Sequence, residues 1–186
     1  MFILGAFAML SMLALNVNRT MYSTQILGLE TETTLNALSI GQSMLDEIMQ
    51  KNFDQMTIDK IAYSYSDITA PWDLGPGPTE AITGWDSCYT SGGLFHDYQS
   101  KLKFSDVDDY KGYMRKVRDP RLGIFEVTDS VMYVKEAAPT VTSSSATFYK
   151  KIVVVVRHPN LPKVNDTSST VIPIILRDIK IYRQYF

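Results

Sequence analysis

Cysteine is almost absent from this 186-residue chain, and so is any strong excess of charge. The single cysteine, Cys88, excludes an intrachain disulfide and a cysteine-based metal knuckle. The formal net charge is −2 and no basic run occurs, so nothing in the composition favours nucleic acid as a partner. This length fits one domain, or a smaller domain plus an extended element outside its core. We expect the second arrangement.

Catalytic motifs are missing as well. The sequence contains no Gly-rich phosphate loop, no Gly-x-Ser-x-Gly elbow and no zinc-type spacing of histidine and cysteine. The two histidines, His96 and His158, lie far apart in the chain. The sequence therefore predicts a protein that is not an enzyme and that holds no cofactor.

The densest group of carboxylates comprises Asp106, Asp108 and Asp109. A hard cation such as calcium takes several oxygen ligands from a short loop, and three aspartates could supply some of them. The full spacing of an EF-hand is absent, however, and Tyr110 with Gly112 fits a turn equally well. We expect a solvated turn whose aspartates cap backbone groups. Calcium is the weaker alternative, and no other metal is predicted.

Charge is also absent from the first fifteen residues, MFILGAFAMLSMLAL. A secretory signal would begin with Lys or Arg, but the first basic residue is Arg19. As a helix, residues 1–17 would reach about 25 Å, less than the roughly 30 Å of a bilayer core. Small residues are interspersed with the large apolar ones, which allows close helix–helix contact. The segment is therefore expected to serve assembly more than simple anchoring.

No proline interrupts the chain before residue 54, and a helical period continues beyond Arg19. We expect one helix over residues 1–54, with residues 1–17 as a membrane or filament-core segment. The face expected to rest on a globular domain carries Leu27, Thr31, Thr34, Leu38, Gly41, Leu45 and Ile48, widened by Leu35, Met44 and Met49. The face expected to meet solvent carries Glu30, Glu32, Asn36, Gln42, Asp46, Glu47, Gln50 and Lys51. The alternative is a membrane anchor followed by a separate helix, broken near Gly28.

The remainder of the chain divides into two regions. Residues 55–124 are expected to form a variable, loop-rich connection, with a Pro- and Gly-rich loop at 71–79. Residues 125–186 are expected to form an antiparallel sheet, with strands at 125–135, 147–157 and 171–182 separated by turns at 137–145 and 158–170. Because Pro173 cannot donate a ladder hydrogen bond, its strand is expected at a sheet edge. The predicted fold class is α+β, a long helix packed on an antiparallel sheet.

This layout resembles the type IV pilin and pseudopilin family. Two stretches carry the likeness in detail: residues 37–54 (ALSIGQSMLDEIMQKNFD) are similar to the helix end of MSHA-type minor pilins, and residues 104–113 (FSDVDDYKGY) to their Asp-Val-Asp-Asp-Tyr-x-Gly segment. The resemblance implies a structural subunit of an extracellular, pilus-like homopolymer at the cell surface. It also implies an inner-membrane stage before assembly. Partners would be identical subunits or related pilins.

The implied assembly interface is the apolar N-terminal segment. It comprises Phe2, Ile3, Leu4, Gly5, Phe7, Met9, Leu10, Met12, Leu13 and Leu15. Family members have a short basic leader ending in Gly, and no such leader is seen here. They also commonly carry Glu at the fifth mature position; if Met1 is mature position one, that place holds Gly5, and the usual charge pair is missing. The alternative function is a membrane-anchored periplasmic or surface binding domain that does not polymerise.

Overall fold

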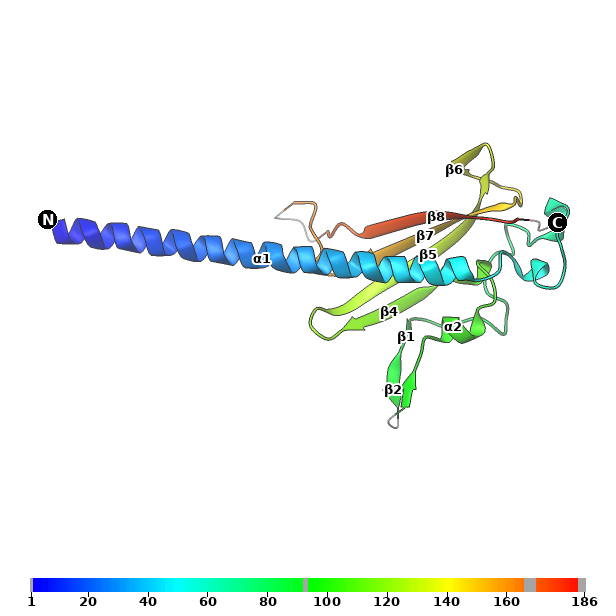
Figure 1. Ribbon diagram of the computed structural model, residues 1–186, viewed down its shortest axis with the longest axis horizontal. Helices are drawn as coiled ribbons and strands as arrows, with labels where there is room; N and C mark the ends of the chain where they lie inside the picture. The colour runs from blue at the N-terminus through cyan, green and yellow to red at the C-terminus, as the bar shows by residue number, and fades with distance from the viewer. Residues whose placement is uncertain (1, 92–93, 166–169, 184–186) are drawn as a thin grey trace.

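One helix dominates the molecule. The computed structural model describes residues 2–91, 94–165 and 170–183, and its first element, α1, runs over Phe2–Gln50 without a break. The 49 residues of α1 extend along the long axis of the molecule, and their N-terminal half projects from a globular head (Figure 1). The continuous helix predicted from the sequence is therefore confirmed, although it ends at Gln50 and not at residue 54. A break near Gly28 is excluded. Met1 lies outside the described residues.

The end of α1 is fixed by the head. The last carbonyls of a helix lack intrahelical partners. Here Lys180 supplies donors, because its Nζ lies 2.8 Å from the carbonyl oxygen of Met49 and also contacts that of Lys51. Just beyond the helix, Asn52 pairs with Asp106 in an isolated parallel bridge.

The head contains one mostly antiparallel sheet. In spatial order its main strands are β1 (Asp86–Ser87), β4 (Met114–Asp119), β5 (Gly123–Lys135), β7 (Tyr149–Arg157) and β8 (Ile174–Ile181). β4, β5, β7 and β8 are antiparallel neighbours, whereas the short β1 runs parallel to β4. β6 (Ala138–Thr142) folds back on the end of β5. The molecule is thus α+β, as the sequence predicts.

Two strands differ from the sequence prediction. The antiparallel part of the sheet begins at Met114 and not at residue 125, because β4 pairs along its whole length with β5. Its sequence, MRKVRD, is charged and gives little strand signal. β6 lies within the stretch 137–145 that was predicted to be a turn. The strands at 125–135, 147–157 and 171–182 are confirmed as β5, β7 and β8, and β8 is an edge strand, as Pro173 indicates.

The region between α1 and β4 is irregular, as predicted. It contains the short helices η1 (Gln55–Thr57), η2 (Tyr65–Asp67), α2 (Gln99–Lys103) and η3 (Asp108–Tyr110), and a hairpin of β2 (Tyr89–Ser91) and β3 (Leu94–His96). The hairpin projects from the head on the side of β1 and α2 (Figure 1).

The core lies between the C-terminal half of α1 and one face of the sheet. Side chains alternate along β5 and β7, so that Val127, Ile152 and Val154 are fully buried against the helix. Phe104, Tyr110 and Tyr113 pack edge to face at one end of this core. α1 is thereby packed on the head from about Thr33 onward, whereas the described side chains of its N-terminal half are exposed.

Candidate functional site

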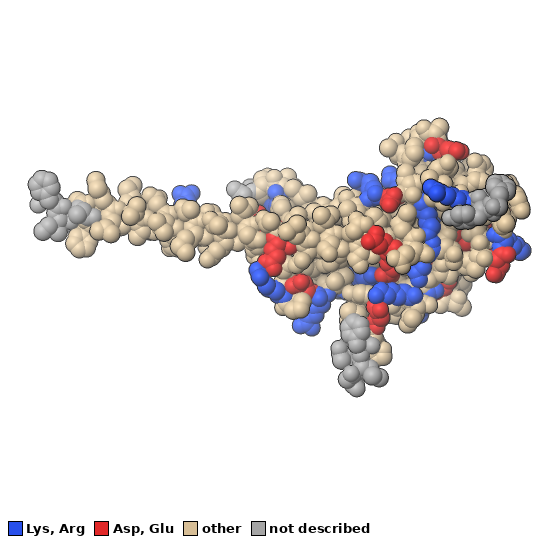
Figure 2. Space-filling model, viewed as in Figure 1, with Lys and Arg blue, Asp and Glu red and all other residues tan. Residues whose placement is uncertain are grey.

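The first part of α1 carries large apolar side chains that no described part of the monomer covers. Phe7, Met9 and Leu13 are 68%, 78% and 64% exposed. Figure 2 shows this projecting segment nearly free of the acidic and basic side chains that cover the head. Within the described part of the chain, no helix contains an apolar stretch long enough to cross a bilayer.

The predicted interface residues are distributed as follows. Phe7, Met9, Leu10, Met12, Leu13 and Leu15 are all exposed on α1. Gly5 is exposed too, and a Cβ added there would meet no other atom within 4 Å. Phe2, Ile3 and Leu4 belong to the helix, but their side chains lie outside the described residues.

The face that α1 turns to the sheet differs from the prediction. Gly41, Leu45 and Ile48 are buried as expected, but Leu27, Leu35 and Leu38 are 62%, 62% and 45% exposed. At the N-terminal end of the contact, the face is instead formed by the small residues Thr33 and Ala37, which are both fully buried. The physical reason is distance: a Cβ on Gly41 would lie 2.7 Å from Cδ1 of Leu176. So close an approach admits small side chains and excludes leucines.

The leucines that were predicted to be buried form part of the exposed surface of α1. Leu27, Thr31 and Leu35 lie on one side of the helix and line a shallow apolar groove. Exposed apolar side chains therefore occur also on the part of α1 that carries the head. We call the exposed apolar side chains of residues 7–38 on α1 the helix stripe.

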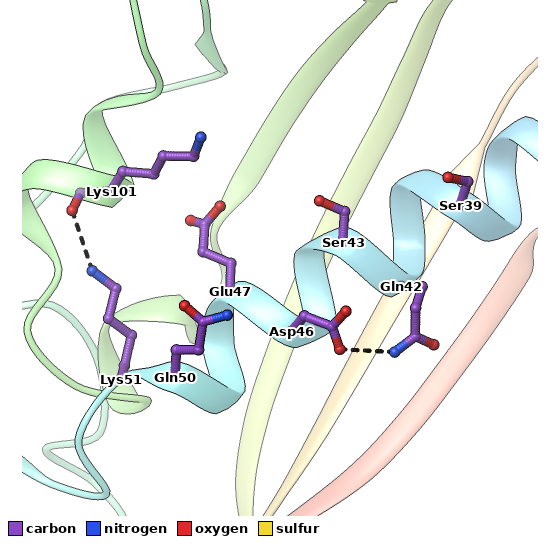
Figure 3. Close-up of a pocket in the computed structure, with 8 residues that line it drawn as sticks. All are labelled: Ser39, Gln42, Ser43, Asp46, Glu47, Gln50, Lys51 and Lys101. Carbon is purple, nitrogen blue, oxygen red and sulfur yellow. Dashed lines mark hydrogen bonds between the residues drawn. The ribbon is translucent and has the colours of Figure 1, made fainter.

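A polar groove lies beside the end of α1. It has a volume of about 810 Å³ and is lined by Ser39, Gln42, Ser43, Asp46, Glu47, Gln50, Lys51 and Lys101. Figure 3 shows most of these side chains on the last turns of α1, with Lys51 just beyond the helix and Lys101 on the facing α2. Gln42 donates to Asp46 at 2.9 Å, and Lys51 donates to the carbonyl oxygen of Lys101 at 3.3 Å. Most of the groove's polar groups therefore already have partners.

Glu47 was predicted to lie on the solvent face of α1, but it instead anchors the helix to the head. Its carboxylate accepts two hydrogen bonds from Arg115, at 2.6 and 2.9 Å, and one from the Tyr110 hydroxyl at 2.9 Å. Burial acts to raise the pKa of Glu47, but the hydrogen bonds and charge of Arg115 outweigh it, so that the pKa is lowered. The guanidinium of Arg115 also stacks on Tyr98, 4.0 Å from the ring centre.

A second polar cluster surrounds Lys150, which is fully buried on the core face of β7. Its ammonium donates to the Phe53 carbonyl oxygen at 2.8 Å and to Asp54 at 2.7 Å, and it pairs closely with Asp108. Burial acts to raise the pKa of Asp54, but Lys150 outweighs it and the pKa is lowered. For Asp108 burial prevails and the pKa rises to about 7. This cluster joins the end of α1 to the sheet.

The three clustered aspartates form a capped turn, as predicted, but the turn is not solvated. Asp106, Asp108 and Asp109 are 2%, 3% and 2% exposed. Asp106 accepts from the backbone nitrogen of Asp108 at 2.7 Å, and Asp109 from that of Ser105 at 2.8 Å. Burial raises the pKa of Asp109 to about 6. Among the residues that the structure describes, no group of acidic, histidine or cysteine side chains has the arrangement of a metal site.

Glu47, Arg115 and Lys150 were not singled out by the sequence, although two of them gave a signal. Lys150 is in the period-two register of Ile152, Val154 and Val156, which places it on the core face. Glu47 lies three residues after the buried Met44 and follows the helical spacing of the contact face. A charged residue in register with a core stripe indicates a buried ion pair. Arg115, in the weakly patterned β4, gave no comparable sign.

Comparison of the chain with protein-family models, with curated proteins and with solved structures gave no match.

Proposed function

We propose that this chain is a structural subunit of an extracellular, type IV pilus-like filament. The observation that carries the proposal is the helix stripe, an apolar surface on a projecting helix with no partner in the monomer. The sequence likeness of residues 37–54 and 104–113 to minor pilins supports the same assignment. The proposed role is structural and not enzymatic.

Assembly exchanges one apolar environment for another. Before assembly, the apolar end of α1 rests in the inner membrane, and on assembly the helix stripes of neighbouring copies, or of related pilins, pack together. Because lipid tails are as apolar as these side chains, the exchange itself releases little hydrophobic free energy, and close packing between the helices supplies the stabilisation. Repeated contacts that do not close on themselves produce a fibre at the cell surface.

The absence of an acidic residue in the projecting segment shapes this proposal. Between Met1 and Arg19 the sequence carries no charged side chain. Such a helix packs without a charge pair between neighbouring subunits. Packing of small and large apolar side chains then determines the affinity.

Removal of the projecting segment tests the proposal against the alternative of a membrane-anchored binding domain. The full chain is purified in detergent, the detergent is removed, and the product is imaged by negative-stain electron microscopy beside a variant that begins at residue 26. We expect fibres from the full chain and soluble monomers from the shorter one. A full chain that inserts stably into bilayers and remains monomeric would sink the filament proposal and favour the anchored domain.

A further inference from the structure

Lys150 occupies a position where a leucine or valine would be expected. It is fully buried, on the same face of β7 as Ile152 and Val154. Burial of an ammonium group is costly unless hydrogen bonds and opposite charge offset the lost hydration. Three oxygens surround Nζ: the Phe53 carbonyl, Asp54 and Asp108. The cluster places an amine nitrogen in direct contact with two carboxyl groups.

The two carboxyl groups have different surroundings. Asp54 accepts further hydrogen bonds from the backbone nitrogens of Met56 and Thr69, at 3.0 and 3.1 Å, and from the Thr69 hydroxyl at 2.9 Å. These donors stabilise its anionic form. Asp108 has no such donors: among the described residues, its Oδ2 is buried without a hydrogen-bond partner. Its environment favours the neutral acid.

The resulting protonation states suit an acid–base reaction. With a pKa of about 7, Asp108 is a neutral carboxylic acid in a large fraction of molecules near neutral pH. Asp54, whose pKa is lowered by Lys150 against the effect of burial, remains an anion there. A pair of carboxyl groups whose environments separate their pKa values can divide the roles of electrophile and base.

Aromatic rings enclose the same nitrogen. The ring of Phe53 lies 4.4 Å and that of Tyr133 5.2 Å from Nζ, measured to the ring centres. Tyr133 is held by a hydrogen bond of 2.7 Å from its hydroxyl to the Thr69 carbonyl. Both residues are almost completely buried, and the cluster is shielded from bulk water. Exclusion of water favours condensation over hydrolysis.

We propose that Lys150 and Asp108 condense to an intramolecular amide bond, with Asp54 as the acid–base group. Asp54 first takes a proton from the ammonium, which frees the nitrogen lone pair. Nζ then attacks Cγ of the neutral Asp108 carboxyl, so that the C–N bond forms and the C–OH bond breaks. A second proton from nitrogen joins the departing hydroxyl as water. The first proton stays on Asp54, so charge and atoms balance without any further reactant.

The bond would connect two parts of the head that are distant in sequence. Asp108 begins η3, close to the end of α1, and Lys150 lies in the second-to-last strand of the sheet. The link closes a covalent loop over residues 108–150. It fixes η3, which lies next to the end of α1, to β7. It forms within one chain, so it does not depend on polymerisation.

Mass spectrometry of the full-length protein tests the bond directly. We expect the intact mass to be lower than that of the unreacted chain by one water. Because Lys150→Arg removes the nucleophilic amine, this variant serves as the unreacted reference, and comparison with it cancels any processing of the N-terminus. Trypsin should release a branched peptide that joins residues 104–111 to residues 136–151. Lys151→Arg, a matched change at the next position, should retain the water deficit.

Substitutions of the acids separate the proposal from ordinary ion pairing. Asp108→Ala should show the full mass of its chain, whereas Asp108→Asn should reach the wild-type mass by releasing ammonia. Asp54→Asn should leave the bond unformed; circular dichroism verifies that these variants are folded. A wild-type chain without the water deficit overturns the proposal even if every variant misfolds. A branched peptide joining Lys150 to Asp54 overturns the assignment of Asp108.

Discussion

Asp129 lies on the core face of β5, between Val127 and Val131. It is 4% exposed, and neither of its carboxyl oxygens has a hydrogen-bond partner among the described residues. Burial raises the pKa of Asp129 well above its ordinary value, and the charge of Arg115 opposes this only in part. In the folded head, Asp129 is therefore a neutral acid at a pH where the unfolded chain carries an aspartate anion.

This difference predicts how stability depends on pH. Between the unfolded and the folded pKa of Asp129, the folded state binds one more proton than the unfolded state. Stability contributed by this group is therefore present at low pH and declines as the pH rises, by about 1.4 kcal/mol per pH unit. Replacement by the neutral, isosteric residue in Asp129→Asn should remove that decline and stabilise the protein at neutral pH.

Chemical denaturation of wild type and Asp129→Asn from pH 4 to pH 8 measures the effect. The control is Asp46→Asn, an exposed carboxylate on α1 that bonds only with Gln42 within the described structure. We expect the control to retain the wild-type slope. A wild-type slope in Asp129→Asn would show that Asp129 does not titrate in this range.

At the scale of elements, the contact between α1 and the sheet depends on one small position. A side chain at Gly41 would meet Leu176 and Val156. Overpacking of this kind typically costs about 1–3 kcal/mol. We expect Gly41→Leu to lower the free energy of unfolding of the head by such an amount, even though leucine is the better helix former.

Gly28 in the same helix provides the matched control. A Cβ there would meet nothing within 4 Å, so Gly28→Leu should leave the stability of the head unchanged or slightly raised. Thermal unfolding of both variants in detergent measures the difference. Equal effects of the two substitutions would contradict the close helix–sheet contact at Gly41.

Elements that depend on local sequence patterns could be predicted, whereas contacts between residues distant in the chain could not. The unbroken α1 was predictable because no proline or turn signal interrupts it, and β7 because of its β-branched run. The packing face of α1 was predictable from Gly41 to Ile48 but not before it, because the close approach of helix and sheet selects Thr33 and Ala37 over neighbouring leucines. The partners of Glu47 and Lys150 lie 68 and 96 residues away, at Arg115 and Asp54. Local pattern cannot identify such partners.

At the scale of the whole molecule, the two ends of α1 have opposite characters. The C-terminal half is fixed by two buried ion-pair clusters and a close contact with the sheet. The N-terminal half projects with its apolar side chains uncovered (Figure 1). Large exposed apolar surfaces on a folded protein mark sites of association. The head therefore carries a long projecting helix with exposed apolar side chains, and the proposed filament contact rests on this feature.

A single charge on the helix stripe tests this account most directly. We compare the polymer yield after detergent removal, by sedimentation and electron microscopy, for wild type, Leu13→Asp and Leu102→Asp. Both leucines are exposed, at 64% and 85%, but Leu13 belongs to the helix stripe and Leu102 to α2. We expect Leu13→Asp to abolish fibres, because an unpaired charge would be buried, and Leu102→Asp to assemble like wild type. Fibres formed equally by both variants would contradict it.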